Sequence, residues 1–139
     1  MWLLEAQYTH TVLIMGKYDY PMPNNPAYLN FASDLLSPLG SIVARSMMGG
    51  HVLYCDSVVF ALIANNTLYL KADAETRPRF EELGLKPFYP FEGQASMSYY
   101  QPPAEFFEAE DVMLEWGRMA VAAGRRSKTK KKRSRSARL

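Results

Sequence analysis

Cysteine and histidine are scarce in this chain of 139 residues, which contains one Cys and two His. A lone cysteine cannot form an internal disulfide, and the apolar run in which Cys55 lies predicts a reduced, buried side chain. A zinc site needs three or four protein ligands, so His10, His51 and Cys55 do not favour a metal centre. We expect His51, which follows two glycines, to form a hydrogen bond at the start of a strand.

Long hydrophobic runs are also missing, since no segment approaches the ~20 apolar residues that span a bilayer. The first fourteen residues are mildly apolar, but Glu5 and His10 interrupt them, and no Lys or Arg precedes them as in a secretory signal. The sequence therefore predicts a cytoplasmic protein.

Complete catalytic motifs are a third absence. The serines Ser37, Ser41, Ser46 and Ser57 lack the Gly-x-Ser-x-Gly setting of a serine hydrolase. Gly49-Gly50 is not followed by the Lys and Ser or Thr of a phosphate-binding loop, and a turn between two strands accounts for both glycines. We therefore predict a protein without enzymatic activity or cofactor; an enzyme with an unrecognised site is a third alternative.

Charge, by contrast, is abundant and uneven. The formal net charge of +2 combines seven Lys and Arg against fourteen Asp and Glu in residues 1–124 with nine Lys and Arg and no acid in residues 125–139. So dense a cationic run repels itself, which predicts a disordered tail that binds nucleic acid nonspecifically or contacts the acidic body. A tail that only aids solubility is the alternative. The candidate phosphate contacts are Arg125, Arg126, Lys128, Lys130, Lys131, Lys132, Arg133, Arg135 and Arg138.

Residues 1–24 show no clear period and end in a segment rich in proline and asparagine. We expect a leader outside the fold, with Met15 and Met22 as alternative starts to Met1. The folded domain is then expected over residues 25–124.

The first element of that domain is a predicted helix, with Asn25 as N-cap and Pro26 at the first helical position. Pro38 and Gly40 end it. Apolar residues recur with the helical period between these limits. The predicted buried stripe is Tyr28, Phe31, Ala32, Leu35, Leu36 and Leu39.

Short alternating segments then predict an antiparallel meander of three or four strands. Asn65-Asn66 suits a two-residue turn because Asn tolerates positive φ. Leu68 and Leu70 share a buried face of the fourth strand. The expected strands are 42–47, 51–56, 58–64 and 67–72, with Gly49-Gly50, Asp56-Ser57 and Asn65-Asn66 between them.

A second helix is predicted over residues 74–83, capped by Asp73, stopped by Gly84, and facing inward with Phe80 and Leu83. Two strands, 88–91 and 95–100, and a last helix, 108–123, complete the domain. The buried stripe of the last helix is predicted to be Val112, Met113, Trp116, Met119, Ala120 and Ala123.

Two residue groups have alternative interpretations. The charged cluster at residues 71–79 suits an anion site at a helix N-terminus, or a solvated face in which Arg77 and Arg79 pair with Glu81 and Glu82; we favour the second. The tyrosines suit a stacking platform for bases, or packing in the core and hairpins, which we favour because an acidic sheet repels phosphates. The residues concerned are Lys71, Asp73, Glu75, Arg77 and Arg79, and Tyr54, Tyr69, Tyr89, Tyr99 and Tyr100.

The order of these segments over residues 25–126 resembles the N-terminal domain of the TfoX/Sxy family, the bacterial competence regulators. The likeness depends on linked blocks such as Met47-Met48-Gly49-Gly50, where family members usually have Met-Phe-Gly-Gly, and the segment 68–73. The signature residues, expected to be structural, are Met47, Gly49, Gly50, Tyr54, Lys71, Asp73, Phe80, Gly84, Tyr99, Tyr100 and Trp116.

The resemblance implies a two-layer α+β domain, similar to the secretion-chaperone-like fold, with helices packed on an antiparallel sheet of five to six strands. It also implies a nonenzymatic adaptor in transcription regulation that acts through protein contacts, beside an activator of the cyclic-AMP-receptor type. Full-length competence regulators carry a second domain where this chain has its basic tail. The alternative function is nonspecific nucleic-acid association through that tail.

Overall fold

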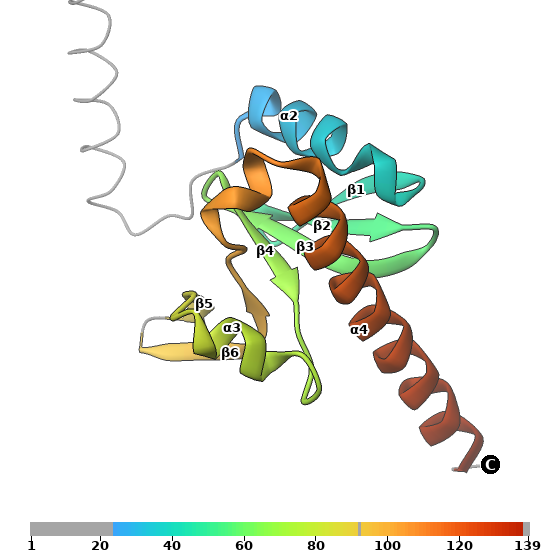
Figure 1. Ribbon diagram of the computed structural model, residues 1–139. Coiled ribbons are helices and arrows are strands. Elements are labelled where there is room, and N and C mark those ends of the chain that lie inside the picture. Colours follow the sequence, from blue (N-terminus) through green and yellow to red (C-terminus); the bar gives the residue numbers. More distant parts are fainter. Residues whose placement is uncertain (1–23, 92, 138–139) are drawn as a thin grey trace, which may run out of the picture.

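The computed structural model describes residues 24–91 and 93–137 (Figure 1). Over these residues the chain forms a six-stranded antiparallel sheet and three α-helices, which confirms the predicted α+β class. The strands lie in the order β1-β2-β3-β4-β6-β5. The elements are α2 (Pro26–Leu36), the 3₁₀ helix η1 (Ser37–Leu39), β1 (Ile42–Met47), β2 (Gly50–Cys55), β3 (Val58–Ala64), β4 (Thr67–Lys71), α3 (Arg77–Glu82), β5 (Pro87–Phe91), β6 (Gln94–Tyr100), the 3₁₀ helix η2 (Ala104–Phe107) and α4 (Glu110–Ala137).

Residues 1–23 of the expected leader, with His10 and the three candidate starts, lie outside the described residues. Its last residue, Asn24, is described. Asn24 is only 8% exposed and belongs to the fold, contrary to the prediction. Its side-chain amide donates to the carbonyl oxygen of Ile63 at 2.8 Å, and its Oδ1 accepts from the amide of Asn66 at 3.0 Å. A buried amide with these partners fixes the entry of the chain at the β3–β4 turn.

Helix α2 begins as predicted, with Pro26 at its first position and the Asn25 side chain accepting a hydrogen bond from the amide of Ala27 at 2.8 Å. Its buried stripe is narrower than expected. Ala32 and Leu36 are buried, whereas Phe31 is 47% exposed and stacks on Phe107 of η2, 6.4 Å between ring centroids. The short helix η2, which the sequence pattern did not predict, provides this partner.

Three two-residue turns with positive φ join the first four strands, at Met48-Gly49, Asp56-Ser57 and Asn65-Asn66. Two of them were predicted. The first turn was predicted at Gly49-Gly50, one residue too late, because Gly50 is part of β2 and pairs with Met47. A Cβ on Gly50 would lie 2.7 Å from the carbonyl oxygen of Ile63, so close strand contact explains this glycine.

Helix α3 starts three residues later than predicted. Asp73 accepts hydrogen bonds from the amides of Glu75 and Thr76 and thereby stabilises a turn that precedes the helix. Pro78 lies in the first turn of the helix, where its missing N–H costs nothing. Phe80 is buried as expected, but Leu83 is 59% exposed, because the helix ends before a second inward turn forms.

The last helix is much longer than predicted, since α4 runs from Glu110 to Ala137 and includes most of the segment expected to be disordered. Lys and Arg are good helix formers, and the packed turns 110–124 provide the nucleus on which further residues add. Repulsion between like charges, of about 0.2–0.5 kcal/mol per pair, is too small to stop that extension. Residues 125–137 extend beyond the sheet (Figure 1), and we call them the arm.

The hydrophobic core lies between the sheet and the helices. One face of the sheet, the helix face, contributes buried residues of β2, β3, β4 and β6, and the helices pack on that face (Figure 1). No described helix packs on the opposite face, the outer face. The largest fully buried side chains are Phe60, Phe80, Phe106, Leu36, Leu53, Ile63, Leu68, Leu70, Met113 and Cys55.

Candidate interaction surfaces

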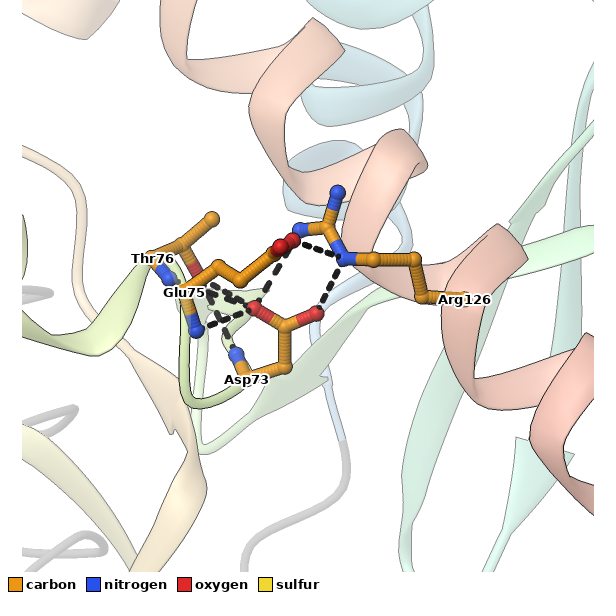
Figure 2. A network of polar contacts seen from close by, with 4 residues as sticks. All are labelled: Asp73, Glu75, Thr76 and Arg126. Atoms are coloured by element: carbon orange, nitrogen blue, oxygen red, sulfur yellow. Dashed lines mark hydrogen bonds and ion pairs between the residues drawn. The ribbon is translucent and has the colours of Figure 1, made fainter.

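The arm is anchored to the body by one of its own cations (Figure 2). Nε of Arg126 donates to Oδ2 of Asp73 at 2.6 Å, and Nη2 of Arg126 donates to Oδ1 of Asp73 at 3.2 Å. The same Nε lies 2.7 Å from a carboxylate oxygen of Glu75. Asp73 and Arg126 are 53 positions apart, so the ionic contact between tail and acidic body that the sequence suggested occurs at a defined place.

This network shifts the proton affinity of both partners. The hydrogen bond from Arg126, with those from the amides of Thr76 and Glu75, lowers the pKa of Asp73 although burial opposes it. The Asp73 carboxylate raises the pKa of Arg126. Because Arg126 and Glu75 are well exposed, with side-chain exposures of 42% and 68%, solvent weakens the ion pairs, and the bidentate contact to Asp73 contributes most.

The other arginines of the charged cluster have partners different from those predicted. Arg77 donates from Nε to the carbonyl oxygen of Met97 at 3.0 Å. Arg79 pairs with Glu115 of α4 at 3.3 Å and lies over the ring of Trp116, 4.7 Å from its centroid. The prediction that these arginines form ion pairs with Glu81 and Glu82 was wrong, because both arginines connect α3 to other elements.

His51 and Cys55 lie at opposite ends of β2. The side-chain amide nitrogen of Asn24 donates to Nδ1 of His51 at 2.9 Å, and Nε2 of His51 lies 3.4 Å from Oγ of Ser46. His51 therefore makes the hydrogen bond that was expected near the strand start. Cys55 is buried and free, as predicted, and burial followed by the Asp56 carboxylate raises the pKa of its thiol. A thiol in this setting is unreactive.

An apolar groove of about 390 Å³ lies on the outer face between the β1–β2 hairpin and β5. The hairpin tip is open to solvent, with Met47 57% and Met48 90% exposed. The groove walls also include Val52, Leu62, Ala64, Phe88, Tyr89 and Pro90. The exposure of Met48 was not predicted from the sequence, although its position beside a glycine in a turn was a signal for it.

The tyrosines do not act as one group. Tyr100 is buried and stacks on Phe80, with 5.2 Å between centroids, which agrees with the expected core packing. Tyr54, Tyr69 and Tyr99 instead lie on the outer face, because they alternate with buried residues along their strands. Tyr89 is 56% exposed on β5.

Eight of the nine predicted phosphate-contacting residues lie in α4, and the ninth, Arg138, is outside the described residues. Within residues 24–91 and 93–137, no three metal-binding side chains form a group. No helix in this part of the chain has the length and apolar character needed to cross a membrane.

The signature residues not yet described have structural roles, in turns or in the core. Gly49 and Gly84 have positive φ values of 83° and 64°. Phe80, Tyr100 and Trp116 meet in one aromatic cluster between α3, β6 and α4, with 5.1 Å between the centroids of Phe80 and Trp116. This cluster attaches α3 and α4 to the same part of the sheet.

These features define a two-layer α+β domain whose accessible sites, among the described residues, are surfaces: a basic arm, an apolar groove and an outer face that no described helix covers. The family model of the TfoX N-terminal domain matches residues 34–124, well over half of the chain, and the chain belongs to that family. The DNA transformation protein TfoX1 of Aliivibrio fischeri (strain ATCC 700601 / ES114) is 31% identical over 83 residues, which cover 58% of this chain and 39% of that protein. The chain thus aligns with less than half the length of this relative.

Proposed function

We propose that this chain is a nonenzymatic regulatory adaptor, linked to competence and transcription, that works by binding another protein. The observation that supports this function is the 90% exposure of Met48 at the tip of the β1–β2 hairpin. An apolar side chain held in water by a rigid turn gains free energy when a partner covers it, about 25 cal/mol per Å². A transcription-linked role would place the protein in the cytoplasm.

The groove beside Met48 supports the same conclusion. Its volume of about 390 Å³ and its mainly apolar walls suit one or two apolar side chains of a partner. Met47 and Met48 are unbranched and flexible, so they can adapt to the shape of what binds there. The partner we propose is a transcription activator of the cyclic-AMP-receptor type, which the family relation favours.

The test is a titration of the full chain with a purified activator of this type, measured by calorimetry. Met48→Asp should weaken binding about tenfold or more, because a carboxylate would be desolvated in the contact. Met48→Phe, the residue that family members usually carry, should bind as the original does.

Leu83→Asp provides the matched control, since Leu83 is another exposed apolar residue, 59% exposed, on α3. It should leave binding unchanged. Equal affinity of the Met48→Asp and original proteins, or no binding by either, would refute the adaptor function.

A second function, nonspecific nucleic-acid binding, is favoured by the helical form of the arm. The helix presents cations on all sides, because residues 128 and 130–133 are all Lys or Arg within about one and a half turns. Phosphates are the expected partners, through release of counterions and without base recognition.

This second function predicts that the affinity for nucleic acid depends steeply on salt, and that this dependence weakens when the charges of the arm are removed. A neutralised arm, with Lys128, Lys130, Lys131 and Lys132 each changed to Gln, keeps Arg126 and its contacts. Affinity for duplex DNA should fall, and the slope of log affinity against log salt should decrease by about 0.9 for each phosphate that the arm no longer neutralises. An unchanged slope would contradict the role of the arm.

A further inference from the structure

A row of tyrosines and cations crosses the outer face at the end of the sheet nearest the arm. Tyr54 lies on that face because its neighbours Leu53 and Cys55 are buried on the helix face. Tyr99 lies there for the same reason, since Tyr100 is buried against α3 and α4. Both tyrosine side chains are partly exposed.

Each of these rings has a cation beside it. The guanidinium carbon of Arg45 is 5.3 Å from the ring centroid of Tyr54, and Nζ of Lys71 is 5.0 Å from that of Tyr99. Lys71 and Tyr99 are directly opposite each other on β4 and β6. We call Arg45, Tyr54, Lys71 and Tyr99 the tyrosine row; it extends from β1 to β6 over four strand spacings, or about 19 Å.

Electrostatic interactions act between the two tyrosines of the row and between Lys71 and the arm. Burial, followed by the charge of Tyr54, raises the pKa of Tyr99. The strands of the two tyrosines, β2 and β6, are three strand spacings apart in the sheet, or about 14 Å. Burial and the charge of Lys131 lower the pKa of Lys71, while Asp73 acts in the opposite direction. Arg126 is held at Asp73, two residues after Lys71, so the arm starts beside this end of the row and carries Lys131 in its next turns.

The outer face is free of the acidic charge that dominates the body. None of the six described strands contains Asp or Glu, so the carboxylates of the described residues lie in helices and connections. Two acids stand two positions after a residue of the row in the sequence: Asp73, which is bound to Arg126, and Asp56, which accepts a hydrogen bond from the amide of Ser41 at 2.9 Å. This face of the sheet therefore does not repel phosphates as the acidic composition of the body suggested.

We propose that the tyrosine row binds single-stranded DNA, with bases stacked on Tyr54 and Tyr99 and phosphates paired with Arg45, Lys71 and Lys131. Single strands present base faces that a duplex hides in its own stack, and rings with adjacent cations are the usual means of holding them. This site deepens the second function above and depends on it, because it adds contacts with bases to an arm that contacts only phosphates.

The bound strand is DNA and not RNA. Apart from Arg45, which is assigned to a phosphate, the residues of β1, β2 and β3 next to Tyr54 on this face are Val43, Val52 and Val59, which offer no side-chain partner to a ribose 2′-hydroxyl. Covering that hydroxyl without a hydrogen bond costs free energy that deoxyribose avoids.

The test is fluorescence anisotropy with the full chain and labelled oligo(dT) of about 12 nucleotides, within the usual range of such sites. Tyr54→Leu and Tyr99→Leu should each weaken binding about tenfold and leave the salt slope unchanged, since a stacking contact carries no charge. Tyr99→Phe should bind like the original. Lys71→Gln should reduce the salt slope by about 0.7.

Tyr89→Leu is the matched control, because Tyr89 is an exposed tyrosine on β5 outside the row. It should leave affinity unchanged, and urea midpoints of all variants should confirm that they are folded. Full affinity in both Tyr54→Leu and Tyr99→Leu, or equal affinity for oligo(dT) and a duplex, would overturn the proposal. Tighter binding of oligo(rU) than of oligo(dT) would overturn the choice of DNA.

The neutralised arm separates this site from the second function. With four arm lysines changed to Gln, affinity should fall for single and double strands, but the preference for oligo(dT) should persist. Disappearance of that preference would refute the tyrosine row as a site. Unchanged duplex affinity would refute only the role of the arm.

Discussion

At the scale of single residues, two glycines permit backbone contacts that any side chain would prevent. Gly50 lets β2 approach β3, since a Cβ there would lie 2.7 Å from the carbonyl oxygen of Ile63. Gly124 lets α4 rest on the start of β3, where a Cβ would overlap the carbonyl oxygen of Val59. Helix and sheet thus touch directly at the last packed turn before the arm.

Gly124→Ala should therefore destabilise the protein, although alanine is the better helix former by about 1 kcal/mol. Overlap with the backbone of Val59 requires displacement of α4, at a typical cost of about 1–3 kcal/mol. Urea unfolding should show a lower midpoint for this variant.

Gly117→Ala is the control for Gly124→Ala. The three atoms nearest to a Cβ at position 117 would all belong to the side chain of Leu39, whose terminal methyl groups can rotate away. Stability should then stay equal or rise. Equal destabilisation in the two variants would contradict the direct contact at Gly124.

At the scale of elements, side chains far apart in sequence connect the helices. Arg79 joins α3 to α4 by covering Trp116 and pairing with Glu115. Arg126 joins α4 to the turn before α3 through Asp73 and Glu75 (Figure 2). The second connection holds the base of the arm and contains a carboxyl group with a lowered pKa.

The contact with Arg126 predicts a pH dependence of stability. Because the pKa of Asp73 is lower in the folded protein, the contact stabilises the fold above the ordinary carboxyl pKa of about 3.9. This stabilisation disappears as the pH falls through the lowered value. Arg126→Gln should cost up to about 1 kcal/mol at pH 7 and should reduce the decrease in stability below pH ~4.

Urea unfolding of the original and Arg126→Gln proteins between about pH 7 and pH ~2.5 would measure this difference across the range in which carboxyl groups titrate. Arg125→Gln serves as the control, since it removes the same charge one position earlier in α4 and leaves the contact with Asp73 in place. Parallel pH profiles for the original and Arg126→Gln would show that Asp73 is not stabilised by Arg126.

At the scale of the whole molecule, charges of opposite sign occupy different regions. Residues 125–139 hold nine cations and no acid, whereas the acids of the described body lie in helices and connections. The arm extends beyond the sheet, and no described helix covers the outer face (Figure 1). One molecule therefore offers a cationic arm to the acidic helices of another.

This separation predicts reversible self-association at low salt. Attraction between the arm and the body of a second chain should be strong when the Debye length is about 30 Å and weak when it is below about 8 Å. Static light scattering should give a negative second virial coefficient at about 0.01 M salt that rises toward zero above about 0.15 M. The neutralised arm should show little salt dependence; a coefficient as negative as that of the original would exclude the arm as the cause.

The local features of this protein follow from the amino-acid sequence alone. The N-cap at Asn25, the turn at Asn65-Asn66 and the meander of strands depend on residues that are neighbours in the chain, whose backbone preferences act in any context. The ends of α4 were less predictable, because the packed turns before Gly124, and not the charges after it, decide whether the helix continues.

The surfaces that the protein presents are instead set by its tertiary structure. The contact between Asp73 and Arg126, the exposure of Met48 and the position of Tyr54 beside Arg45 depend on how separate elements pack. The acidic composition of the body suggested a sheet that repels phosphates, whereas the fold places that charge on the helices and connections. Composition counts charges without locating them, and the face on which a charge lies is set by contacts between distant parts of the chain.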